Sequence, residues 1–244
     1  MSRNFELLSK ALQEDLMQVE SAPQEQEEAV LDPVAEPPSE PAESVPQGPE
    51  EVQLTNLVQR VFLSAGTGAP RMVGFAAVEA GVGCSWVCAR VSKILAAHVA
   101  GSVCVVDANL RTPGLHTQLG VTNRPGVNDA LLQTEPLANY ARPLIGKKLW
   151  IVSSGYRSSG LDGSAISEPM RLQIAGLRNQ FEYVLLDMPP LSKYADAIAL
   201  GGICDGIILV LRANSSRRNT AIKAVADLKA ANVNVLGVTL NQRT

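Results

Sequence analysis

The stretch MVGFAAVEAGVGCSWVCARVSKILAAHV, residues 72–99, joins a strand pattern to a helix pattern through a glycine-rich loop. Its first part, up to Val78, is an apolar run of strand length, whereas the part from Trp86 onward has the length of a helix. The loop between them, EAGVGCSW, contains Gly81 and Gly83. Such a loop aims backbone N–H groups and a helix N-terminus at an anion, so the stretch predicts a phosphate-binding turn.

The alternation of strand and helix patterns continues to residue 240. Strand-like runs occupy 71–78, 103–108, 149–154, 183–188, 206–213 and 233–240, and helices are expected at 51–64, 85–99, 126–133, 168–180, 195–202 and 216–231. Buried strands separated by helices indicate a parallel sheet covered on both faces. We therefore predict an α/β fold, a doubly wound and mostly parallel sheet of the P-loop NTPase type, over residues 51–244.

The first 50 residues differ in composition from the rest of the chain. Phe5, Leu12 and neighbouring leucines recur at helical spacing and predict a short amphipathic helix at 1–18. This helix is either a docking peptide for a partner or a frayed tail. Residues 19–50 are rich in Pro and Glu and contain no aromatic residue, which predicts a disordered, extended linker.

Charge is distributed unevenly along the chain. Residues 1–51 hold 13 of the 24 acidic and two of the 21 basic residues, so the remainder carries 19 basic against 11 acidic residues. This excess suits phosphate ligands or an anionic membrane surface, and equally an ordinary solvated basic surface. Only 4% of residues are aromatic, and no basic stripe is interleaved with them, so we expect no nucleic-acid binding.

The absence of targeting signals and the spacing of the cysteines indicate the cellular compartment of the protein. The sequence has no apolar run of 18 residues and no apolar signal-peptide core, so we expect a cytoplasmic protein. The cysteines lack paired spacing, which indicates reduced, mostly buried thiols; they are Cys84, Cys88, Cys104 and Cys204. His98 and His116 are too few and too scattered to predict a metal site.

Polar residues mark the carboxyl ends of three predicted strands, where ligands bind in folds of this kind. The strand predicted at 71–78 is followed by the glycine loop and then by Ser85. Asp107 ends the second strand in VVDANLRTP (105–113), and Asp187 ends the third in YVLLDMPPL (183–191). Two carboxylates facing a glycine loop predict a magnesium–nucleotide site. The alternative is that both aspartates cap structural turns.

Four phrases of the sequence together resemble the bacterial tyrosine kinases of polysaccharide export, a branch of the deviant P-loop (MinD/ParA-like) ATPases. They are EAGVGCS (79–85), VVDANLRTP (105–113), FEYVLLDMPPLSKYADAIAL (181–200) and VNVLGVTLN (233–241). The resemblance covers about residues 51–244, and it implies ATP and Mg²⁺ as cofactors.

The resemblance also implies roles for individual residues. It assigns the magnesium-handling carboxylates to Asp107 and Asp187, which would be the catalytic pair of an active enzyme, with Ser85 as a further magnesium ligand. The nucleotide would be held by Gly81, Val82, Gly83, Cys84, Ser85 and Asn241, the last of these near the base.

The sequence departs from the family at the residues that carry positive charge. Cys84 stands where the phosphate-binding lysine is expected, and Glu79 stands where many relatives have a second lysine. A lysine about 4 Å from a phosphate contributes roughly 4 kcal/mol at an effective dielectric near 20, and a carboxylate there would repel. The second carboxylate of the family's D-x-D phrase is replaced by Asn109. These changes act against triphosphate binding.

The departures favour a catalytically impaired, tyrosine-kinase-like protein of exopolysaccharide biosynthesis. It would regulate or scaffold a membrane-bound polysaccharide chain-length or export protein, and be peripheral at the inner face of the plasma membrane through that partner. The alternative is an active tyrosine kinase or ATPase in which Arg90, Lys93 or a partner replaces the lysine. A redox role for Cys84 is also open, because a thiol at a helix N-terminus has a lowered pKa.

Two further features of the family are expected to be missing. Leu54 and Leu57 stand where the family has the arginines of a ring-assembly motif, although homo-oligomerisation by other contacts stays open. The family phosphorylates a tyrosine cluster at its C-terminus, whereas the tyrosines here are scattered at Tyr140, Tyr156, Tyr183 and Tyr194. We therefore expect no tail substrate in cis.

Overall fold

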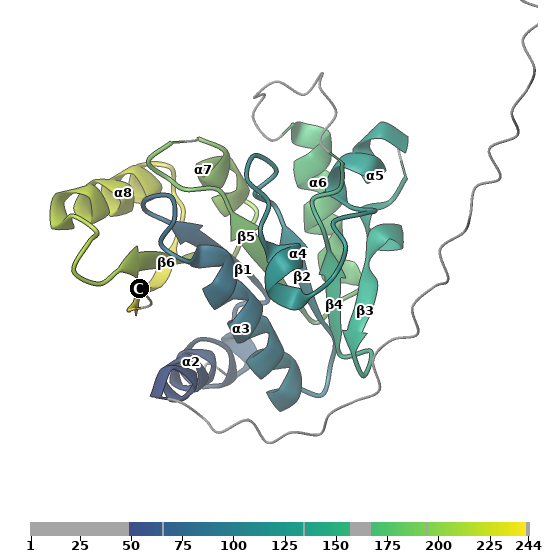
Figure 1. Cartoon of the computed structure of the whole chain (residues 1–244), viewed down its shortest axis with the longest axis horizontal. Coiled ribbons are helices and arrows are strands. Elements are labelled where there is room, and N and C mark those ends of the chain that lie inside the picture. The colour runs from purple at the N-terminus through teal and green to yellow at the C-terminus, as the bar shows by residue number, and fades with distance from the viewer. Residues whose placement is uncertain (1–48, 65, 134, 157–166, 194, 243–244) are drawn as a thin grey trace, which may run out of the picture. The chain divides into compact units, whose positions relative to one another are not determined.

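The computed structural model describes residues 49–64, 66–133, 135–156, 167–193 and 195–242 (Figure 1). The helix predicted at 1–18 and nearly all of the linker predicted at 19–50 lie outside the described residues. Within those ranges, no helix has the length and apolar character needed to cross a bilayer.

A seven-stranded sheet forms the centre of the fold. Its strands are β1 (Met72–Ala77), β2 (Val103–Asp107), β3 (Arg142–Ile145), β4 (Leu149–Val152), β5 (Tyr183–Met188), β6 (Gly206–Arg212) and β7 (Val235–Asn241). They lie in the order β3-β4-β2-β5-β1-β6-β7, and every neighbouring pair is parallel except β3 with β4. The predicted, mostly parallel sheet is confirmed.

Helices cover both faces of this sheet (Figure 1). They are α2 (Pro49–Val58) with a π-helical turn η2 (Gln59–Leu63), α3 (Cys84–His98), α4 (Leu115–Leu119), α5 (Val127–Gln133), α6 (Glu168–Gly176), α7 (Asp196–Gly201) and α8 (Arg218–Ala230). One apolar core lies between the sheet and α2, α3 and α4, and a second lies between the sheet and α5 to α8. Because β1, β2 and β5 are buried on both faces, they read as continuous apolar runs.

The strand β3 and the helix α4 were not predicted from the sequence. The edge strand β3 spans four residues and contains Pro143, which cannot donate to a sheet ladder, so it gives almost no strand signal. Helix α4 has only five residues, too few for a periodic pattern to emerge. The strand predicted at 149–154 ends at Val152, because the chain then turns to pair Ser153 with Gly126.

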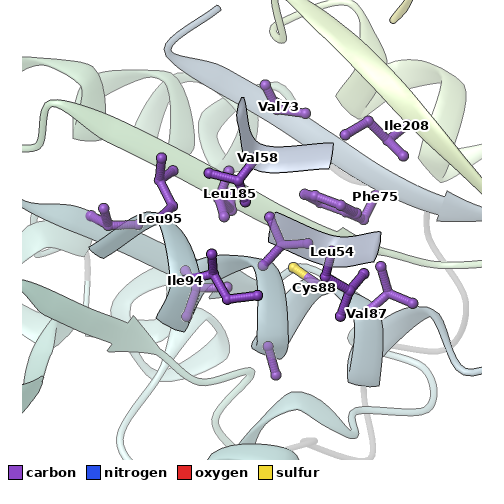
Figure 2. Packing of buried hydrophobic residues seen from close by; sticks show 14 of the residues in the cluster. Leu54, Val58, Val73, Phe75, Val87, Cys88, Ile94, Leu95, Leu185 and Ile208 are labelled. Atoms are coloured by element: carbon purple, nitrogen blue, oxygen red, sulfur yellow. The ribbon is translucent and has the colours of Figure 1, made fainter. Parts of the chain in front are cut away.

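The N-terminal helix α2 packs against α3 through a continuous apolar stripe. Leu54, Val58 and Phe62 are buried there, and Figure 2 shows Leu54 and Val58 among the side chains of the core. Phe62 meets Tyr183 edge to face, with the ring centroids 5.9 Å apart. Leu57 packs partly against the same core. Leu54 and Leu57, which the resemblance compares with a ring-assembly motif, therefore contribute to the interior of this domain.

Candidate functional site

Strand β5 lies between β1 and β2, and this placement brings the two predicted carboxylates together. Asp107 at the end of β2 is in register with Asp187 on β5, and both side chains are fully buried. One oxygen of Asp107 accepts a hydrogen bond from the backbone N–H of Leu115 at 3.1 Å. The other oxygen of Asp107 and both oxygens of Asp187 have no hydrogen-bond partner among the described residues. Buried carboxylate oxygens of this kind are candidates for a cation.

The environment of the pair favours protonated carboxyls when no cation is present. Burial, together with the charge of Asp187, raises the pKa of Asp107 to about 8. Burial raises the pKa of Asp187 to about 7, although the neighbouring Ser85 hydroxyl and Cys84 thiol act in the opposite direction. Desolvation disfavours a charged carboxylate, and a divalent cation at the pair would remove that penalty.

The glycine loop has a conformation that only glycine adopts easily. Gly81 and Gly83 have φ values of +80° and +86°, and Gly83 caps the N-terminus of α3. A side chain at Gly83 would also collide with the amide of Asn241. That amide donates a hydrogen bond to the carbonyl of Val82 at 2.8 Å. The resemblance places Asn241 near the base of the nucleotide. In the structure, Asn241 at the end of β7 stabilises the glycine loop through this hydrogen bond.

Cys84 and Ser85 begin α3 directly beside the carboxylates. Burial, followed by the charge of Asp187, raises the pKa of the Cys84 thiol well above its usual range. The redox interpretation of Cys84 assumed that the helix N-terminus lowers the pKa of this thiol. The structure shows the opposite shift, so that interpretation is wrong. The Ser85 hydroxyl lies near both Asp187 and Gly114. The residue that replaces the lysine is a neutral thiol at the carboxylate pair.

The loop after β2 is held by its own side chains. The amide of Asn109 donates to the carbonyl of Thr112 at 3.0 Å, so Asn109 closes a local turn. Arg111 pairs with Asp196 at the start of α7, with Nε and Oδ2 3.0 Å apart. Both residues thus fix the loop that follows Asp107.

Arg90 and Lys93, the cations of the alternative in which the site is active, lie on α3 beyond the glycine turn. They line a cavity of about 270 Å³ together with Trp86, Ala89 and Gln118, and no residue of 79–85 lines it. The guanidinium of Arg90 lies over the Trp86 ring, 5.7 Å from its centroid. Burial, with the charge of Arg90 added, lowers the pKa of Lys93. The cavity that holds these two cations thus adjoins Trp86 and is not lined by the glycine turn at 81–84.

The structure also brings together residues that the sequence did not connect with the site. His116 on α4 lies with Nδ1 4.0 Å from Asp107 Oδ2, because the short helix folds back over β2. Arg212 ends β6 in register with Asn241, and a strand-end rule applied to the run 206–213 would have found it. The described part of the chain holds no cluster of three His, Cys, Asp or Glu side chains suited to a metal. Magnesium often uses one or two carboxylates, with water and phosphate oxygens completing its shell.

The sheet order and the glycine turn define the fold of the MinD/ParA-like P-loop NTPases. Two solved structures with this fold are the septum site-determining protein MinD of Pyrococcus horikoshii, complexed with Mg-ADP, and the kinase domain of the Escherichia coli tyrosine kinase ETK. The MinD structure has a TM-score of 0.58 and 21% identity, covering 70% of this chain and 69% of that one. The ETK kinase domain has a TM-score of 0.64 and 20% identity, covering 70% and 67%. No family model matches the sequence.

The curated relatives of the chain are bacterial tyrosine-protein kinases, so the predicted resemblance is confirmed. Tyrosine-protein kinase YwqD of Bacillus subtilis is 27% identical over 139 residues, which is 57% of this chain and 59% of YwqD. The putative tyrosine-protein kinase EpsB of Ralstonia solanacearum is 25% identical over 200 residues, which is 82% of this chain and 26% of EpsB. The chain thus spans only part of the length of the relatives that it matches.

Proposed function

We propose that this protein binds a magnesium–nucleotide complex and is impaired in phosphoryl transfer. The observation that carries the proposal is the pair Asp107 and Asp187, in register, fully buried and with three carboxylate oxygens unpartnered among the described residues. Such a pair is costly unless a cation completes it. The bacterial tyrosine kinases among its relatives support a nucleotide as the companion of that cation.

The residues present fit magnesium. Asp107, Asp187 and the Ser85 hydroxyl would hold the ion, and the glycine loop would present its backbone N–H groups to the phosphates. Bound magnesium neutralises charge on phosphate oxygens. Cys84 provides no positive charge there, and Glu79 adds a negative one. Binding with little or no turnover is the expected result.

The experiment that tests this proposal is calorimetric titration of the protein with Mg-ADP and Mg-ATP. We expect binding by the native chain, tighter binding by Cys84→Lys and none by Asp187→Asn. A radiolabelled γ-phosphate assay on the same samples should show little transfer by the native chain. Rapid transfer to tyrosine would contradict impairment, and an absence of magnesium-dependent binding would contradict the site itself.

We further propose a regulatory or scaffolding role in exopolysaccharide biosynthesis and export. The partner would be a membrane-bound polysaccharide chain-length or export protein, and this chain would be peripheral at the inner face of the plasma membrane through that contact. The support is the resemblance to export kinases, with the loss of the loop lysine. Co-purification with the export protein from solubilised membranes tests this role. If the full chain is not retained when that protein is immobilised, the partner proposal fails.

A further inference from the structure

Arg212 ends strand β6, which lies between β1 and β7. Its Cα is in register with Asn241 on β7, and Val210, two residues earlier, is in register with Ala77 at the end of β1. Because side chains alternate between the faces of a sheet, Arg212 leaves β6 on the same face as Val210 and Asn241. Val210 packs in the core under α3, and the Asn241 amide bonds to the carbonyl of Val82. Arg212 therefore lies on the sheet face that carries the loop.

The guanidinium of Arg212 has a donor, Nε, that is available to a ligand. Its Nε is buried and has no hydrogen-bond partner among the described residues, and none of the ion pairs found in that part of the chain includes Arg212. The base of the side chain is fixed, because the Arg212 N–H donates to Ser216 Oγ at 3.0 Å and the Arg212 carbonyl accepts from the Ser216 N–H at 3.0 Å. An arginine whose backbone is fixed, and whose Nε has no hydrogen-bond partner among the described residues, is suited to an anion.

We infer that Arg212 supplies the phosphate-binding positive charge that the loop itself lacks. A guanidinium offers planar paired donors that match phosphate oxygens, so it replaces a lysine as a binding charge. This charge comes from the strand next to β1, opposite the magnesium side formed by Asp107 and Asp187 on β2 and β5. The anion is the polyphosphate of a nucleotide, and the inference rests on the proposed magnesium–nucleotide site.

Titration with Mg-ADP by calorimetry tests this inference on the full chain. Arg212→Gln is expected to weaken binding by at least about tenfold, the loss typical of one charge-assisted hydrogen bond. Arg212→Lys should lose less, because it keeps the charge without the planar donors. The matched control is Arg217→Gln, an exposed arginine at the start of α8, which should bind within about twofold of the native chain.

A rescue experiment separates a phosphate contact from a structural role. Cys84→Lys, introduced into Arg212→Gln, should restore Mg-ADP binding, because both side chains would serve the same phosphates. If the double variant stays weak although its thermal unfolding matches that of the single variants, Arg212 only supports the fold. Equal binding by the native chain and Arg212→Gln overturns the role of Arg212 alone. Failure of the native chain to bind Mg-ADP overturns the proposed site and this inference with it.

Discussion

At the scale of single residues, the buried carboxylate of Asp187 lowers the stability of the fold when it is ionised. Its two oxygens are buried and make no hydrogen bond of good geometry among the described residues, although the Ser85 hydroxyl and the Cys84 thiol lie nearby, so the ionised form is poorly solvated. Asp187→Asn removes that charge at almost constant volume. In the presence of a chelator at pH 8 we expect the variant to gain about 1–3 kcal/mol of unfolding free energy, measured with urea. The control Asp227→Asn changes an exposed carboxylate on α8 and should have little effect. A loss of stability in Asp187→Asn would mean that hidden partners satisfy the carboxylate.

The same carboxylates predict how stability depends on pH. Their pKa values rise from 3.8 in the unfolded chain to about 8 for Asp107 and about 7 for Asp187 in the fold, so the folded state binds more protons between these limits. The contribution of this pair to the free energy of unfolding is then fully present below about pH 4 and is lost as the pH rises toward about 8. Denaturant titrations across this range in a chelator measure the slope, and the double variant Asp107→Asn, Asp187→Asn should flatten it. With magnesium the slope should shrink, since the ion displaces the protons. A stability that rises with pH in the chelator would refute these pKa shifts.

At the scale of elements, the docking of α2 on α3 depends on one stripe of the helix. Leu54 is 6% exposed within the core shown in Figure 2, whereas Val52 on the same helix is 45% exposed. Leu54→Ala is expected to cost about 2–4 kcal/mol, because it leaves a cavity between α2 and α3. Val52→Ala should stay within about 0.5 kcal/mol of the native chain. Urea unfolding of both variants measures the difference, and equal effects would show that α2 contributes little to the core.

At the scale of the whole molecule, burial predicts the order in which the sheet opens. Strands β1, β2 and β5 are buried along their full length, whereas edge strand β7 leaves Val238 and Leu240 52% and 61% exposed. Amide hydrogens of β7 and of the other edge strand, β3, should therefore exchange well before those of β5. Hydrogen exchange followed by mass spectrometry measures this order. Uniform protection across all strands would indicate that the edges are covered, for example by another copy of the chain.

Local patterns were sufficient for most of the fold and for part of the site. The apolar runs that became β1, β2 and β5, and the strand-end positions of Asp107 and Asp187, follow from composition over a few neighbouring residues. Helix α4 and strand β3 were missed, because five residues and a proline-containing edge carry little periodicity. His116 was missed with α4, since only the turn of the chain after β2 brings it to Asp107.

The sequence by itself determined the α/β alternation, the glycine loop and a cysteine, without positive charge, at position 84, because each of these depends on residues that are adjacent in the chain. Only the tertiary structure decided that β5 enters between β1 and β2, which sets Asp107 opposite Asp187 and buries both. It also decided that the Cys84 thiol has a raised pKa and that Arg212 lies on the sheet face that carries the loop. Register and desolvation arise from contacts between segments far apart in the chain, and no local pattern encodes them.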